Sequence, residues 1–116
     1  MRDIADIYTK LGCFEYETGY YDGALYSFLL SHELLEFLHD HEAQRASLYN
    51  IAITYHFGMN DYETALMYYD RLEKLFEQAK NEKDDFINML RMKSSALESL
   101  GRYVEATESL EKIGTL

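Results

Sequence analysis

The sequence GYYDGAL, residues 19–25, decides the fold because the chain repeats it twice more. It returns as NDYETAL at residues 60–66 and as GRYVEAT at residues 101–107. The tyrosines Tyr21, Tyr62 and Tyr103 lie 41 residues apart, and an alanine three residues later keeps the same step. Self-similarity at a fixed period of this length is typical of proteins built from stacked repeats.

Each copy of this segment has the residue types expected at a turn between two helices. Gly19, Asn60 and Gly101 tolerate a left-handed backbone, so we expect each of them to end a helix. Asp22 and Asp61 follow in the first turn of the next helix, where a carboxylate meets the positive helix end. The sequence therefore predicts three helical hairpins.

The rest of the chain favours helix throughout, because it contains no proline and few β-branched runs. We predict an all-α chain whose six helices cover residues 2–18, 22–39, 42–57, 61–80, 84–100 and 103–113. They form one domain, 1–116, with repeats at about 2–40, 42–81 and 83–116. In the second copy one extra residue, around Met59, is expected to lengthen the turn.

The first helix shows apolar residues at three- and four-residue steps, which predicts the stripe that faces the core. This predicted buried stripe consists of Ile4, Ile7, Tyr8, Leu11, Gly12 and Phe14.

Charge and composition restrict the class of partner. With 47% apolar and 28% charged residues, the 116-residue chain has the composition of a soluble globular domain. Its 11 basic residues face 21 acidic ones, a net charge of -10, whereas phosphate backbones are bound by clustered Lys and Arg. We therefore expect a protein or peptide ligand and no nucleic acid.

The single cysteine, Cys13, cannot form an internal disulfide, which favours a reducing, cytoplasmic location. No apolar run approaches the ~18 residues of a membrane span, and the first residues lack a signal-peptide core. The sequence predicts a protein that is neither membrane-bound nor secreted.

The three copies resemble the tetratricopeptide repeat. That repeat has a large residue, Leu, a small residue and an aromatic in its first helix, then Gly, Tyr, Ala and an aromatic after the turn. The first copy supplies Tyr8, Leu11, Gly12, Gly19, Tyr21, Ala24 and Phe28. The second supplies Leu48, Ile51, Ala52, Tyr55, Asn60, Tyr62, Ala65 and Tyr69. The third supplies Leu90, Ser94, Leu97, Gly101, Tyr103, Ala106 and Leu110, with Lys93 where Leu is usual. The resemblance implies three hairpins stacked into a right-handed superhelix.

The step of 41 residues exceeds the 34 of the common repeat. Longer repeats of this kind resemble those of peptide-responsive bacterial regulators of the Rap and PlcR type. In those regulators asparagines on first helices hold the backbone of a short peptide in the concave groove. Asn50 stands in the matching place here, with Asn88 as a second candidate.

Stacked hairpins place their first helices on the concave side, so the outward faces of these helices are expected to line a groove for a protein or peptide. The side chains predicted to line this groove are Thr9, Cys13, Tyr16, Tyr49, Asn50, Ile53, His56, Phe57, Asn88, Arg91 and Ser95, with Asp6 and Glu98 on the same faces. Amides satisfy peptide N–H and C=O groups together, and tyrosine contributes contact area at low entropy cost.

Other chemistries are less well supported by the sequence. His32, Glu36 and His39 share one helical face near His41, but their spacing matches no established zinc motif, so we predict no metal site. Cys13 has no activating neighbour in the sequence and is expected to be inert. No phosphate loop, nucleophile elbow or His-Glu-x-x-His motif occurs, so the sequence predicts neither catalysis nor a cofactor.

A clamp for chaperone tails needs several converging Lys, Arg and Asn residues, and only Asn50 and Arg91 are in place. We therefore exclude that function.

Repeat arrays normally close with a helix whose outer face is polar, and no seventh helix is predicted after residue 113. We therefore expect either that the last hairpin pairs with a partner or another copy, or that the chain is a fragment of something longer. Self-association through Val104, Leu110 and Ile113, with the apolar faces of Ile87 and Leu97, is one expectation. The primary prediction is a non-catalytic protein- or peptide-binding scaffold, and the alternatives are a peptide-sensing regulator of the Rap/PlcR type and a self-associating module.

Overall fold

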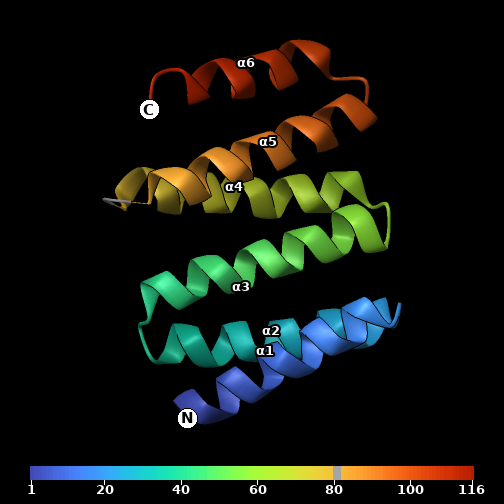
Figure 1. The fold of residues 1–116 in the computed structure, drawn as a ribbon, viewed down its shortest axis with the longest axis vertical. Coiled ribbons are helices and arrows are strands. Elements are labelled where there is room, and N and C mark those ends of the chain that lie inside the picture. Colours follow the sequence, from blue (N-terminus) through green and yellow to red (C-terminus); the bar gives the residue numbers. More distant parts are fainter. Residues whose placement is uncertain (80–81) are drawn as a thin grey trace.

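The computed structural model describes residues 1–79 and 82–116, and all regular structure in these ranges is helical. The six α-helices and one π-helical turn are α1 (Arg2–Glu17), α2 (Tyr21–Phe37), α3 (His41–Ile53), η1 (Thr54–Gly58), α4 (Tyr62–Gln78), α5 (Lys83–Ser99) and α6 (Tyr103–Ile113). The prediction of an all-α chain of helical hairpins is confirmed (Figure 1). The predicted end of the fourth helix, at Lys80, lies outside the described residues.

The turns within the hairpins have the predicted backbone. Gly19, Asn60 and Gly101 have φ angles of 84°, 54° and 76°, the left-handed region in which glycine and asparagine are favoured. The helices that follow begin at Tyr21, Tyr62 and Tyr103. A fourth left-handed residue, His39 at φ 55°, lies between α2 and α3 and was not predicted.

Aspartates cap two of the helices. The carboxylate of Asp40 accepts a hydrogen bond from the Ala43 amide at 3.1 Å, and that of Asp61 accepts one from the Thr64 amide at 3.2 Å. Such caps satisfy amides that have no partner within the helix. Asp61 therefore precedes α4 as its cap, whereas Asp22 lies in the first turn of α2, as predicted.

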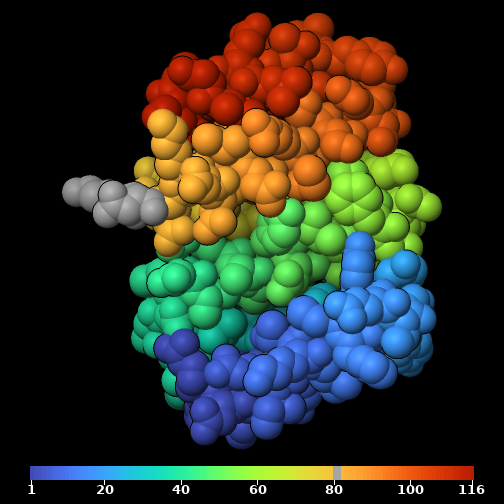
Figure 2. Space-filling view, in the orientation of Figure 1, coloured from blue at the N-terminus to red at the C-terminus, as the bar shows by residue number. Residues whose placement is uncertain are grey.

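The hairpins are stacked in one direction, and the stack measures 40 × 32 × 18 Å. Figure 1 shows α1 and α6 at opposite ends of the long axis, each with a chain terminus. The space-filling view in Figure 2 shows the same succession from the N-terminal to the C-terminal hairpin. The helices therefore form an open stack of hairpins and not a closed bundle.

The main core lies in the second and third hairpins. Its central residues include Leu48, Tyr69, Leu72, Met89 and Leu97, all almost fully buried between α3, α4 and α5. A smaller cluster joins the first hairpin to α3 through Ala24, Phe28 and Ile51.

The predicted buried stripe of α1 is wrong for four of its six residues. Ile4, Ile7, Leu11 and Phe14 are all exposed, whereas the residues of α1 that are fully buried are Ala5 and Gly12. Small residues face α2 because the two helices approach closely, and a methyl group added at Gly12 would lie 2.6 Å from Cε1 of Phe28. Helical periodicity identified the helix, but it selected the wrong face.

The extra residue of the second copy is accommodated within the helix. The sequence predicted a longer turn around Met59, but residues Thr54–Gly58 form a π-helical turn at the end of α3. A π turn closes its hydrogen bonds over five residues instead of four, so it takes up one additional residue. The tyrosine that begins α4 then follows the turn as it does in the other hairpins.

Candidate functional site

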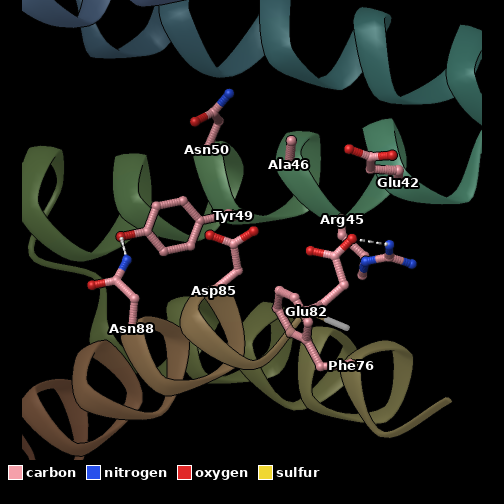
Figure 3. A pocket seen from close by; sticks show the side chains of 9 residues that line it. All are labelled: Glu42, Arg45, Ala46, Tyr49, Asn50, Phe76, Glu82, Asp85 and Asn88. Atoms are coloured by element: carbon pink, nitrogen blue, oxygen red, sulfur yellow. Dashed lines mark hydrogen bonds and ion pairs between the residues drawn. The ribbon is translucent and has the colours of Figure 1, made fainter. Parts of the chain in front are cut away.

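A pocket of about 230 Å³ lies between the first helices of the second and third hairpins (Figure 3). Its lining residues are Glu42, Arg45, Ala46, Tyr49, Asn50, Phe76, Glu82, Asp85 and Asn88.

The helical period explains why α3 contributes five of these residues. Positions 42, 45, 46, 49 and 50 are separated by steps of three and four, so they share one face of the helix. In α5, Asp85 and Asn88 are separated by three residues and face α3. Phe76 comes from the last turns of α4, and Glu82 precedes the first residue of α5.

A hydrogen bond between two predicted groove residues bridges the two first helices. The Asn88 amide Nδ2 donates to the Tyr49 hydroxyl at 2.9 Å. Figure 3 shows Tyr49 reaching across to α5, whereas Asn50 lies on the side of α3 that faces away from α5. The amide of Asn88 is thereby oriented by the structure before any ligand binds.

One end of the pocket is stabilised by an ion pair and by aromatic rings. Arg45 donates to Glu82 Oε1 at 3.1 Å, and the two side chains are only 13% and 23% exposed. The Arg45 guanidinium lies 5.9 Å from the centre of the Phe76 ring, which stacks on Phe86 at 5.4 Å. This end of the pocket is therefore ordered by contacts among α3, α4 and α5.

The pocket is acidic. It contains three carboxylates, from Glu42, Glu82 and Asp85, against the single guanidinium of Arg45. Because Arg45 is paired with Glu82, the carboxylates of Glu42 and Asp85 remain to attract a cation. No other ion pair within the described residues involves either of them.

Three of the eleven predicted groove residues, Tyr49, Asn50 and Asn88, line this pocket. Of the others, Cys13, Phe57 and Arg91 are exposed, and Ile53 and Ser95 are half-buried. The structure does not bring these five into the pocket.

Two further predicted groove residues contact their own hairpin. The Thr9 hydroxyl donates to the Ala5 carbonyl at 3.1 Å and lies 2.7 Å from the Ser31 hydroxyl of α2. The Tyr16 ring packs edge-on against Tyr21, with ring centres 5.4 Å apart. Their place in the groove stays a prediction.

His56 is wrongly predicted as a surface residue. Its side chain is only 2% exposed, its Nδ1 lies 2.9 Å from the Tyr69 hydroxyl, and its ring stacks on Phe57. Burial lowers the pKa of His56, because a buried imidazole disfavours the charged form. The π turn places this residue inside the hairpin, so it cannot line a groove.

The histidines considered for zinc lie in different environments. His32 is buried with its Nδ1 2.5 Å from the Ser47 hydroxyl, whereas His39 and His41 are exposed. Within the described residues no three His, Cys, Asp or Glu side chains gather as metal ligands. Cys13 is exposed as a residue, but its thiol is partly desolvated. This desolvation, and to a lesser extent the nearby Glu17 carboxylate, raises the pKa of the thiol and disfavours the reactive thiolate.

The residues considered for self-association differ in their exposure. Val104 and Leu110 are exposed on α6, whereas Ile113 is half-buried and packs on the main core. Leu97 is wrongly predicted to offer an apolar face, because it is 1% exposed at the centre of the core. Ile87 is half-buried on α5.

Sequence reasoning missed the charged and apolar residues that complete the pocket. Glu42 and Arg45 could have been found by counting back in steps of three and four from Tyr49 and Asn50. The part played by Phe76 and Glu82 had no such signal, because their proximity depends on how the second and third hairpins pack.

No helix in the described ranges is both long enough and apolar enough to cross a membrane. A search of curated proteins finds no match. A family model described as tetratricopeptide repeat matches residues 3–78, about two thirds of the chain. This match and the stacked helical hairpins agree, and the chain belongs to the tetratricopeptide repeat family.

Proposed function

We propose that this chain is a non-catalytic scaffold whose α3–α5 pocket holds a basic side chain of a protein or peptide partner. Tetratricopeptide repeats typically mediate protein interactions, which supports the general class. The observation that carries the specific proposal is that Glu42 and Asp85, whose carboxylates form no ion pair within the described residues, line one pocket with the Tyr49 ring.

The size of the pocket favours a side chain over a small molecule. Pockets for drug-sized ligands usually measure about 300–1,000 Å³. The volume here is about 230 Å³, which suits one long side chain from a larger partner.

The chemistry of the walls favours lysine or arginine. Tyr49, which is half-buried, offers ring surface to the aliphatic part of such a side chain, and cations are attracted to aromatic faces. Glu42 and Asp85 supply negative charge for its end. The amides of Asn50 and Asn88 lie beside this pocket and offer both donors and acceptors to the partner's backbone.

An array of extended peptides that differ only in one central residue, Arg, Lys, Gln or Glu, tests this proposal. We expect the Arg and Lys peptides to be retained and the Glu peptide to be rejected. For the tightest peptide, Tyr49→Ala should raise the Kd by about tenfold or more, a loss of about 1.4 kcal/mol. The double variant Glu42→Gln/Asp85→Asn should weaken the Arg peptide and leave the Gln peptide unchanged, as measured by fluorescence anisotropy.

The matched control is Glu63→Gln, which removes an exposed carboxylate at the start of α4, the end of that helix far from Phe76. It should leave the Kd unchanged. Added salt should weaken the Arg peptide, because exposed charges are screened. Preference for the Glu peptide, retention of none of the four, or an unchanged Kd in Tyr49→Ala would each refute the pocket.

The remaining predicted groove residues other than His56 would extend this surface along the first helices, and their contribution is part of the proposal. The peptide-sensing alternative differs from the scaffold in the size of the natural partner. A folded protein recovered by pull-down supports the scaffold, whereas a short peptide that raises the melting temperature supports a sensor.

A further inference from the structure

The exposed side of α1 carries a continuous apolar stripe. Ile4, Ile7, Leu11 and Phe14 are 50%, 63%, 44% and 64% exposed, and their steps of three and four residues align them along the helix. The opposite side, with Ala5 and Gly12, packs on α2. Nothing in the described part of the chain covers the stripe.

Two of these positions, those of Ile7 and Phe14, are buried in both of the other first helices. The three helices can be compared by aligning the small residues Gly12, Ala52 and Ser94 of the repeat. The residues that correspond to Ile7 and Phe14 are then Ser47 and Thr54 in the second hairpin and Met89 and Ala96 in the third. All four are at most 3% exposed.

The preceding second helix covers this face. The Ser47 hydroxyl of α3 lies 2.5 Å from His32 Nδ1 of α2. Lys93, which corresponds to Leu11, binds Asp70 and Glu73 of α4 at 2.9 and 2.7 Å. This side of a first helix is therefore built to pack on the second helix of the hairpin before it.

The complementary surface is exposed at the other end of the stack, on α6. Tyr103 and Leu110 are 67% and 45% exposed. The residues that correspond to Leu110, counted from the tyrosine that begins each second helix, are Phe28 and Tyr69, and both are buried.

The first residue of α2 shows how a second helix packs on the first helix of the next hairpin. The ring of Tyr21, which corresponds to Tyr103, packs on Gly58 at the end of the next first helix, so closely that a methyl group there would lie 2.7 Å from the ring. In contrast, Val104 corresponds to Asp22 and Glu63, which are exposed acids inside the stack. We therefore place Val104 outside the contact, although the sequence suggested it for self-association.

We propose that copies of this chain associate head to tail, with the α1 stripe of one copy on the α6 face of the next. The contact continues the α2–α3 and α4–α5 packing already present within each copy. The inference is independent of the peptide pocket. Because the two surfaces differ, the contact is heterologous and does not close on a pair, so the assembly grows with concentration. The charge of -10 on each copy opposes it, so added salt should strengthen the assembly, the reverse of its effect on the pocket.

Two single variants that each block one surface test the proposal by sedimentation velocity and light scattering. The wild-type mass should rise with concentration, in the high micromolar range, above the 13.7 kDa of one chain. Ile7→Glu and Leu110→Glu alone should each remain at the mass of one chain. Mixed together they should form a complex of twice that mass and nothing larger, because each retains the surface that the other lacks.

The control is Val104→Glu, which adds the same charge on the same helix and should assemble like the wild type. Helical circular dichroism establishes that each variant is folded, and Ile7→Ser with Leu110→Ser replaces any glutamate variant that unfolds. A wild-type chain that stays at the mass of one copy overturns the proposal, as does a mixture that forms no complex. A Leu110→Glu variant that still forms pairs overturns it in favour of a symmetric α1–α1 contact.

Discussion

The first hairpin and the two that follow it are held together by different kinds of residue. The fully buried residues of α1 are the small Ala5 and Gly12, and hydrogen bonds link this helix to α2: Ser31 donates to the Ala5 carbonyl at 3.0 Å, and Ser27 donates to Glu15 at 2.6 Å. The second and third hairpins share a large apolar core that includes Leu72 and Met89. The comparison shows that one repeat pattern can be stabilised mainly by close approach and hydrogen bonds or mainly by apolar burial.

The largest expected effect tests this contrast with one chemical change at two places. Leu72→Ala should lower the free energy of unfolding by about 2–5 kcal/mol, because it leaves a cavity in a fully buried site. Leu11→Ala on the exposed side of α1 should change it by less than about 0.5 kcal/mol. Urea denaturation at a concentration where the chain is monomeric measures both. Equal losses would contradict the difference between the two regions.

A smaller effect probes the close approach in the first hairpin. Gly12→Ala should reduce stability by about 1 kcal/mol, because overpacking costs about 1–3 kcal/mol and better helix propensity returns about 1. The added methyl group would contact the buried Phe28 ring, so Phe28→Leu should suppress the effect in a double-mutant cycle.

Cys13→Ala, next to Gly12 but exposed, is the control and should be nearly neutral. A stabilised Gly12→Ala variant would show that the two helices have room to spare.

The smallest effect depends on pH and distinguishes two buried histidines. Burial lowers the pKa of His32, partly opposed by Glu36 and assisted by Arg71, and burial also lowers the pKa of His56. The unfolded chain therefore binds protons first as the pH falls below about 6.5, so stability is retained above that pH and declines below it. Thermal melts between pH 7.5 and 5 should show this decline, and His56→Gln should flatten it.

Because His32 bonds to Ser47 across the boundary between α2 and α3, its protonation should loosen the first hairpin more than the rest. In hydrogen exchange at pH 5.5, the amides of α1 and α2 should lose protection, relative to their intrinsic exchange rates, before those of α4 and α5. An equal loss of protection in all four helices would mean that the two regions unfold together.

Much of the fold could be predicted because it depends on local chemistry. The left-handed turns at Gly19, Asn60 and Gly101 follow from conformational preferences of single residues, and the helix bounds differ from those predicted by only a few residues where both are described. The buried face of α1 could not be predicted, because its apolar residues have the period of a core stripe whether a neighbouring helix covers them or not. The pocket was found in part through Tyr49, Asn50 and Asn88, but its acidic character depends on residues that only the packing of the hairpins brings together.

The π-helical turn at Thr54–Gly58 has a consequence for how this chain can change over time. Because the helix itself takes up the additional residue, the hairpins on either side keep their relative orientation. Insertion of one residue at the end of a first helix therefore need not change how the hairpins after it pack. The same position is where an engineer could lengthen the chain, or evolution could lose that residue again, without disturbing the register of the stack.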